Sequence, residues 1–270
     1  GHCLLSMWAC RREAKRLRRS VLQLHRRPYC AAIDAFHDKM DRGLGAPERL
    51  HALQATVCAS LFERGWCTVD GLLDEEHARV ARAEAAGLFR QGGYSRSYSL
   101  VEETGEKLWR PNVFMAELGS ESWRASPTLV VLLSELMGAL PALVNDGYLQ
   151  LDSTARHQPP LLSASIFGHK LAVSTADEAR YPKHLDNVTG GADRRKLTAV
   201  YYMNPTWDVE AQGGAIRLYD RVDAPSSAAN TPGTPPLAYT DVSPAGAAGA
   251  SDRLLLFWSD LVVHEVLPMR

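Results

Sequence analysis

The sequence lacks long apolar runs and an excess of charge of either sign. No apolar stretch reaches the roughly 18 to 20 residues that a membrane span requires, and CLLSMWAC near the start is too short and poorly placed for the core of a signal peptide. The formal net charge is -1, so the overall charge does not favour nucleic acid or an anionic membrane as a partner. We therefore expect a protein that binds neither a membrane nor nucleic acid.

Cysteine is also scarce, and several well-known motifs are missing. The five cysteines are an odd number, all lie in the first quarter of the chain, and show no CxxC motif or Cys/His metal spacing. Free thiols in a reducing compartment are the simplest interpretation, which predicts an intracellular protein in the cytoplasm or nucleus. The sequence has no P-loop and no GxGxxG motif, and we expect Gly213 and Gly214 to form a turn at a strand edge rather than a phosphate cradle.

Apolar residues, by contrast, make up 46% of the 270 residues, which is enough to build a sizeable core. The segment 11–28 is basic and contains a single acidic residue, Glu13. We expect residues 1–47 to be a basic extension, helical or disordered, with a targeting or nuclear-import segment as the alternative. Residues 48–270 are expected to form one domain, and because a strongly patterned stretch stands just before Arg270, we expect this domain to be truncated at its C-terminal end.

Helical patterns dominate the first half of this domain. They cover residues 49–65, 75–89 and 127–140, with a strand predicted at 66–73. The first helix is expected to end at Gly65 and the second to begin after Asp74 as its N-cap. The third is expected to begin at Pro127 with Ser126 as its N-cap, and to end just before Pro141.

Short β-rich runs dominate the second half, after about residue 161. They cover residues 163–175, 196–204, 213–220, 236–243, 252–260 and 261–268. The Pro-, Ala-, Ser- and Gly-rich stretches 221–236 and 244–251 between them are expected to be surface loops. Many short strands that follow a helical layer predict an α+β fold, a sandwich or jelly roll with helices packed outside.

A candidate metal site lies in the stretch YPKHLDN. Side chains at i and i+2 of a strand leave the same face, so His184 and Asp186 could both point at one atom. His264, on the last predicted strand, could join them, because a jelly roll can bring late strands beside early ones. Two histidines and one carboxylate are the ligand set that holds non-haem Fe(II) with open positions. From spacing alone, the alternative is a surface His184 and a hydrogen-bonded core His264.

The remaining histidines have no such neighbours in the sequence. They include His77, His157 and His169, and we expect no metal at any of them.

The stretches YPKHLDN, TAVYYMNPTWDVEAQGGAIRLYD and DRLLLFWSDLVVHEV, in this order, resemble the catalytic core of the prolyl 4-hydroxylase group of 2-oxoglutarate- and Fe(II)-dependent dioxygenases. The closest resemblance is to the prolyl hydroxylases (PHD type) that modify hypoxia-inducible factor. It extends over residues 51–270 and is strongest from Tyr181 onward.

This resemblance implies a double-stranded β-helix (jelly-roll, cupin-like) core. It also implies an enzyme that hydroxylates prolyl residues of a protein or peptide substrate, with Fe(II), 2-oxoglutarate, ascorbate and O2. A role in oxygen sensing and the hypoxia response is a further implication.

The resemblance also implies roles for particular residues. His184, Asp186 and His264 become the iron ligands, and the hydroxyl group of Tyr202 becomes a contact of the 2-oxoglutarate carboxylate, with a core aromatic of a β-strand as the alternative. Arg217 matches the family pattern too, but we expect it to brace its strand.

We expect Trp258 to be a core residue.

The sequence departs from the family pattern in three places. Ser174 stands where the family often has a tyrosine. In the family, a basic residue about nine positions after the second histidine ligand pairs with the distal carboxylate of 2-oxoglutarate. Arg270 lies only six residues after His264, so we expect that basic residue beyond Arg270. The segment 92–114, in the region of the substrate-covering loop, has no convincing match, so the substrate stays open. A related dioxygenase acting on another side chain or a small molecule, and a non-catalytic metal-binding module, are the alternatives.

Overall fold

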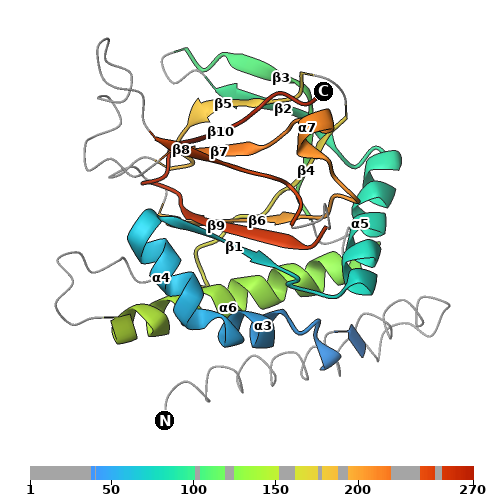
Figure 1. The fold of residues 1–270 in the computed structure, drawn as a ribbon. Helices are drawn as coiled ribbons and strands as arrows, with labels where there is room; N and C mark the ends of the chain where they lie inside the picture. The colour runs from blue at the N-terminus through green and yellow to red at the C-terminus, as the bar shows by residue number, and fades with distance from the viewer. Residues whose placement is uncertain are drawn as a thin grey trace.

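The structure is a computed structural model of the 270-residue chain, and it consists of helices and antiparallel sheets (Figure 1). It describes residues 38–39, 41–100, 104–118, 125–151, 162–175, 178–187, 194–219, 238–246 and 251–270. The basic segment 11–28, the loop 221–236 and His157 lie outside the described residues, so the predictions made for them stay predictions. The predicted boundary between residues 47 and 48 also stays a prediction.

The first predicted helix is in fact two helices. The structure has α3 over Ala46–Ala52 and α4 over Gln54–Arg64, so the prediction of a continuous helix is wrong at Leu53. The backbone of Leu53 leaves the helical region at φ -105° and ψ 6°, and its N–H bonds three residues back, to the carbonyl of Leu50. The predicted end at Gly65 is confirmed, at a φ of 85° that favours glycine.

The next two elements agree with the sequence. β1 spans Trp66–Asp70, and α5 spans Glu75–Arg90. Asp74 is the N-cap of α5, as predicted, because its side chain accepts a hydrogen bond from the backbone N–H of His77 at 2.8 Å.

The third helix, α6, is longer than predicted. It spans Pro127–Leu151 and contains Pro141, which we expected beyond its end. Proline removes one backbone hydrogen bond, but contacts with α3, α4 and α5 along its length outweigh this local cost. Its buried apolar side chains among the described residues are Leu129, Val131, Leu132, Leu136, Leu140, Leu143 and Val144.

Residues 127–148 of α6 are long and apolar enough to cross a membrane by length and composition, although we expected no such stretch. This is weak support for a membrane span, since the core helix of a soluble protein passes the same test. In this structure 44% of its most apolar window is buried, and the helix packs against three others. We interpret α6 as a core helix of this domain.

The start of α6 is capped from another helix. The hydroxyl group of Ser126, the predicted N-cap, is buried and has no hydrogen-bond partner among the described residues. The carboxylate of Glu84 on α5 instead accepts hydrogen bonds from the backbone N–H groups of Thr128 (3.1 Å) and Leu129 (3.0 Å). Helix N-termini leave such N–H groups without intrahelical partners, so a carboxylate is well placed there.

We therefore expect Glu84→Ala to lower the free energy of unfolding by about 1 kcal/mol, the usual loss for a helix cap. Urea denaturation followed by circular dichroism measures this change. Glu76→Ala on the same helix is the matched control, because Glu76 forms an exposed ion pair with Arg79, and no resolvable change is expected there. Equal midpoints for the Glu84→Ala variant and the wild type would contradict the capping role.

Every predicted β-rich run contains a strand. These strands are β4 (Leu171–Ser174), β6 (Leu197–Tyr202), β7 (Ile216–Tyr219), β8 (Tyr239–Val242), β9 (Arg253–Trp258) and β10 (His264–Val266), with the short helix α7 (Val209–Gln212) before β7. A further strand, β5 (Tyr181–His184), lies in the YPKHLDN stretch, between two of these runs. Gly213 is the C-cap of α7 and forms an isolated β-bridge with Met269, and both Gly213 and Gly214 have positive φ shortly before β7; the expected strand-edge turn stays a prediction.

The hairpin of β2 (Ser95–Leu100) and β3 (Lys107–Ala116) was not predicted as strands. Its side chains are mostly polar or exposed, so they lack the alternation of buried and exposed positions from which strands are predicted.

The strands form three antiparallel sheets, with the orders β1-β9-β6, β5-β10-β7-β8 and β2-β3-β4. Helices α3, α4 and α6 lie along the outer side of the first sheet, and the second sheet lies across from its other side (Figure 1). The central strand β9 is almost wholly buried: the indole N–H of Trp258 donates to the carbonyl of Leu61 on α4, while the ring of Phe257 contacts His264 of the second sheet. The predicted core position of Trp258 is confirmed.

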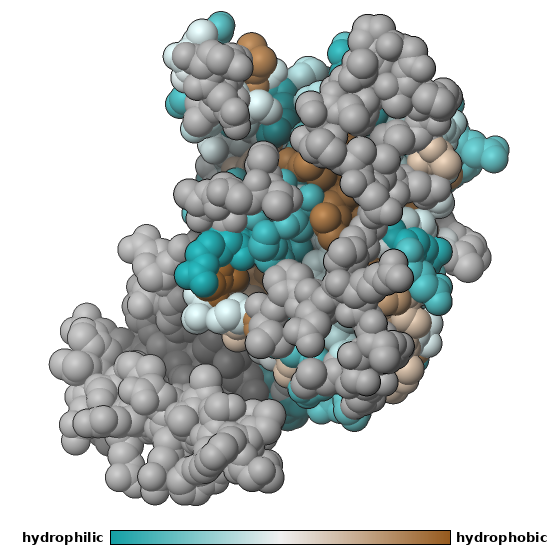
Figure 2. All heavy atoms as spheres, turned by 90° about the vertical axis from the view of Figure 1, so that its left-hand side faces the viewer, coloured by the Kyte–Doolittle hydropathy of each residue, from teal (hydrophilic) through white to brown (hydrophobic). Residues whose placement is uncertain are grey.

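The left-hand side of Figure 1 faces the viewer in Figure 2. Apolar side chains come to the surface in the middle of this face and are flanked by hydrophilic ones (Figure 2).

Candidate metal centre

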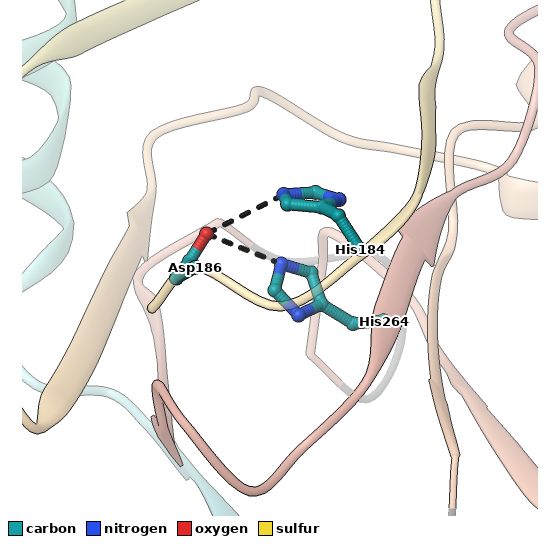
Figure 3. Close-up of side chains that lie close together, drawn as sticks. All are labelled: His184, Asp186 and His264. Carbon is teal, nitrogen blue, oxygen red and sulfur yellow. Dashed lines mark ion pairs between the residues drawn. The ribbon is translucent and has the colours of Figure 1, made fainter. Parts of the chain in front are cut away.

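Strand pairing brings the two candidate histidines together from distant parts of the sequence. β5 ends at His184 and β10 begins at His264, and in the antiparallel pair of these strands the two residues stand directly opposite each other. Their ring centroids are 4.3 Å apart. Asp186 follows β5 by two residues and turns its carboxylate toward both rings (Figure 3).

The three side chains converge on one point. Nε2 of His184 lies 3.4 Å and Nε2 of His264 lies 3.5 Å from Oδ1 of Asp186, and one ligand atom from each residue lies within 4.8 Å of the others. Adjacent ligands of an ion with bonds of about 2.1 Å stand about 3 Å apart, so the three residues fit around one ion after a small adjustment. The predicted convergence is therefore present, and the assignment of iron to it is taken up below.

Access to this point is uneven. The side chain of His264 is only 5% exposed, whereas those of His184 and Asp186 are 31% and 33% exposed. Solvent therefore reaches His184 and Asp186, whereas His264 is almost closed off from it.

Backbone carbonyl groups orient both imidazole rings. Nδ1 of His184 lies 2.7 Å from the carbonyl of Pro182, and Nδ1 of His264 lies 3.1 Å from the carbonyl of Val262. A ring that donates its Nδ1 proton keeps the lone pair on Nε2, the atom that faces Asp186 in both cases. Histidine ligands of protein metal sites are commonly held in this way.

The carboxyl group of Asp186 is ionised at neutral pH. Burial raises its pKa, but the neighbouring imidazoles of His184 and His264 and the hydroxyl group of Thr198 outweigh burial and hold the pKa well below its usual range. Asp186 therefore presents a carboxylate, the form that a metal ion requires.

Tyr202 lies on the same side of its strand as the metal site. Thr198, four residues earlier on β6, donates a hydrogen bond to Asp186, and alternate residues of a strand point to the same face. Tyr201 points to the other face and donates to Asp252 at 2.8 Å. Burial raises the pKa of Tyr202 against the lowering effect of Arg253, so its phenol stays protonated and able to donate.

The expected structural role of Arg217 is confirmed. Its guanidinium binds both carboxylate oxygens of Asp241 on β8, at 2.7 and 2.8 Å, and lies over the ring of Tyr239 at 3.8 Å. Arg217 stands directly opposite Glu265 in the register of β7 and β10, and Glu265 points to the other face of the sheet from its neighbour His264. Arg217 therefore lies on the face of the second sheet that is opposite to His264.

The structure also places Arg270 and Ser174, two residues at which the sequence departs from the family pattern. Arg270 donates from Nη1 to the carbonyl of Glu210 on α7, and Ser174 ends β4 opposite Val113.

The structure also places residues near the site that the sequence did not single out. Arg253 stands directly opposite Tyr202 in the register of β6 and β9, with its guanidinium bound to both oxygens of Asp70. Thr198 and Ser259 form a chain of hydroxyl groups that leads to Asp186. All three residues lie in stretches that carry the family resemblance, Thr198 in TAVYYMNPTWDVEAQGGAIRLYD and Arg253 and Ser259 in DRLLLFWSD, but the sequence did not point to them individually.

Comparison with known proteins agrees with this geometry. Residues 170–270, which include all three candidate ligands, match the family model of the 2OG-Fe(II) oxygenase superfamily. This segment is therefore similar to the members of that superfamily. The description of the superfamily names the metal and the cosubstrate that the sequence predicts, Fe(II) and 2-oxoglutarate (2OG).

Two curated relatives are similar to this chain. The chain is 26% identical over 225 residues to the hypoxia-inducible factor prolyl hydroxylase of Caenorhabditis elegans, an alignment that covers 82% of this chain and 27% of the relative. It is 36% identical over 89 residues to human Egl nine homolog 1, covering 33% of this chain and 16% of the relative. The chain thus spans about a quarter of the nematode relative's length.

Solved structures share the fold of this chain. A Trichoplax adhaerens prolyl hydroxylase in complex with a hypoxia inducible factor peptide fragment aligns with a TM-score of 0.60 and 21% identity, covering 82% of this chain and 86% of that one. A Pseudomonas putida prolyl-4-hydroxylase aligns with a TM-score of 0.54 and 21% identity, covering 80% and 91%.

Proposed function

We propose that this oxygenase is a 2-oxoglutarate- and Fe(II)-dependent enzyme that hydroxylates prolyl residues in a protein or peptide. The observation that carries the proposal is the convergence of His184, Asp186 and His264 on one point, with both imidazole rings oriented by backbone carbonyl groups. We also propose that the two facing sheets, β1-β9-β6 and β5-β10-β7-β8, are the halves of a double-stranded β-helix.

The three residues suit Fe(II) because two imidazoles and one carboxylate on one side leave the remaining positions of the ion open. When bound, Fe(II) would couple the oxidation of 2-oxoglutarate by O2, which yields succinate and CO2, to the insertion of the second oxygen atom into a C–H bond of the substrate. Ascorbate would keep the metal reduced. The chain's own residues orient the ligands, and the exposed side of the site admits the substrate.

A prolyl substrate is supported by the names of the relatives. The nematode relative is a hypoxia-inducible factor prolyl hydroxylase, and the Trichoplax structure contains a peptide fragment of that factor. Oxygen sensing is a narrower version of the same proposal.

An intracellular location, in the cytoplasm or nucleus, is consistent with Cys58 and Cys67, which are buried and unpaired.

The decisive experiment measures succinate produced from 2-oxoglutarate in the presence of Fe(II), ascorbate and O2. We expect production to rise when a protein extract rich in proline is added, and mass spectrometry to find proline residues that have gained one oxygen atom. The His184→Ala variant serves as the control and is expected to produce no succinate above background.

Other outcomes of the same assay would favour the alternatives. The epimerase SnoN from nogalamycin biosynthesis, which is α-ketoglutarate dependent, aligns with a TM-score of 0.51 and 15% identity, so the fold also serves a small-molecule reaction. Stimulation by small molecules alone would favour a related dioxygenase. Metal binding without any succinate would favour a non-catalytic metal-binding module.

We propose that the Tyr202 hydroxyl binds a carboxylate of 2-oxoglutarate. Replacing Tyr202 with phenylalanine is then expected to weaken 2-oxoglutarate binding about 10- to 100-fold, because a hydrogen bond to a charged group contributes roughly 1.5 to 3 kcal/mol. Titration of 2-oxoglutarate into the metal-loaded protein measures this change.

The neighbouring tyrosine provides the control. Tyr201→Phe removes the hydrogen bond to Asp252 on the opposite face of β6, so it is expected to lower the stability of the protein and leave 2-oxoglutarate affinity nearly unchanged. If the Tyr202→Phe variant binds 2-oxoglutarate as tightly as the wild type, Tyr202 is the core aromatic of the alternative interpretation.

A further inference from the structure

The stretch DRLLLFWSD contains a residue that the proposed function leaves without a role. Trp258 packs under α4, but Ser259, the next residue, is 3% exposed and turns its hydroxyl group toward the metal site. We infer that Ser259 and Thr198 are positioning residues, which together determine which oxygen of Asp186 faces the metal. This inference rests on the proposed function, since it concerns the same Fe(II) site.

The hydroxyl groups form a directed chain. Oγ1 of Thr198 donates its only proton to Oδ2 of Asp186 at 2.6 Å. Oγ of Ser259 lies 2.8 Å from the same Oγ1, so Ser259 donates its proton to Thr198. A hydroxyl group that accepts one hydrogen bond becomes a better donor of the next, which strengthens the contact with the carboxylate.

Backbone hydrogen bonds hold Ser259 in place. Its N–H donates to the carbonyl of Lys196 at 2.9 Å, and its carbonyl accepts from the N–H of Asn187 at 3.0 Å. Lys196 lies just before β6, which carries Thr198, and Asn187 adjoins Asp186. The turn after β9 is thus tied to both segments that supply the chain of hydroxyl groups.

The chain of hydroxyl groups assigns different tasks to the two oxygens of Asp186. Oδ1 faces Nε2 of both histidines, whereas Oδ2 is engaged by Thr198. A carboxylate held in this way binds a metal ion through one oxygen, because binding through both would break a short charge-assisted hydrogen bond. One-oxygen binding leaves more of the ion's coordination positions open, and the proposed cosubstrate needs such positions.

Thr198→Val tests the inference because valine keeps the shape of threonine and removes the hydroxyl group. With Co(II) as the probe, we expect this variant of the full chain to bind the ion about 10-fold more weakly, as is usual when the partner of a metal ligand is lost. We also expect its visible Co(II) spectrum to change, because the freed carboxylate can bind through both oxygens. Ser259→Ala is expected to change the spectrum in the same direction but less, and it keeps the test decisive if the valine variant does not fold.

Two control variants separate the hydroxyl group from general effects of substitution. Thr198→Ser retains a hydroxyl group and should restore the wild-type spectrum and affinity. Thr68→Val makes the same change on β1, at the other edge of the same sheet, and should leave both unchanged.

Wild-type affinity and spectrum in both Thr198→Val and Ser259→Ala would overturn the inference. So would a loss of affinity with an unchanged spectrum, or a Thr198→Ser variant that behaves like Thr198→Val. These measurements need no turnover, so a failure here is distinct from a wild-type protein that produces no succinate, which would overturn the proposed function instead.

Discussion

Replacing His184 with alanine is expected to weaken Fe(II) binding by more than about 100-fold. Loss of a residue that only orients a ligand already costs about 10- to 100-fold, and the structure places His184 among the ligands themselves. His184 is partly exposed, so its removal should leave the fold intact, unlike removal of the buried His264. Metal content after dialysis, together with a competition titration against a chelator, measures the change.

His77→Ala is the matched control for this experiment. Its ring pairs with Asp74 at the start of α5, at 2.6 Å, and belongs to no group of candidate ligands among the described residues. Iron binding in this variant should equal that of the wild type. If iron still binds normally to a chain that lacks both His184 and Asp186, the assignment of the metal centre is wrong.

Replacing Phe257 with alanine is expected to lower the free energy of unfolding by about 3 to 5 kcal/mol, the usual loss when a buried phenylalanine leaves a cavity. Phe257 is 1% exposed on the central strand β9, and its ring centroid lies 4.6 Å from that of His264. At about 1.4 kcal/mol per tenfold, this is roughly a hundredfold to several thousandfold in the folding equilibrium. Chemical denaturation of the metal-free protein measures the loss.

Phe62→Ala makes the same chemical change on the surface of α4. Phe62 is 44% exposed and contacts the ring of Tyr148 at one edge only, so the expected loss is at most about 1.5 kcal/mol. Similar losses at the two positions would mean that β9 is not the centre of the core, contrary to the packing described here.

The helices and strands show where local patterns suffice. Asp74, Gly65 and the alternating runs from residue 163 onward act through their own backbone neighbours, so the sequence predicts the elements they start, end or form. The prediction that α6 ends before Pro141 was wrong. The local effect of a proline favours the end of a helix, whereas α6 is held along its length by contacts with three other helices. Glu84 could not be predicted as the cap of α6, since it lies on a different helix.

The sequence by itself determined the ligand types at the candidate metal centre, because the spacing of His184 and Asp186 and the position of His264 can be read along the chain. Only the tertiary structure decided how these side chains are held. The pairing of β5 with β10 sets the two rings opposite each other, and the turn after β9 places Ser259 beside Thr198. Such contacts join strands that are distant in sequence, and no local pattern records which hydroxyl group will meet which carboxylate.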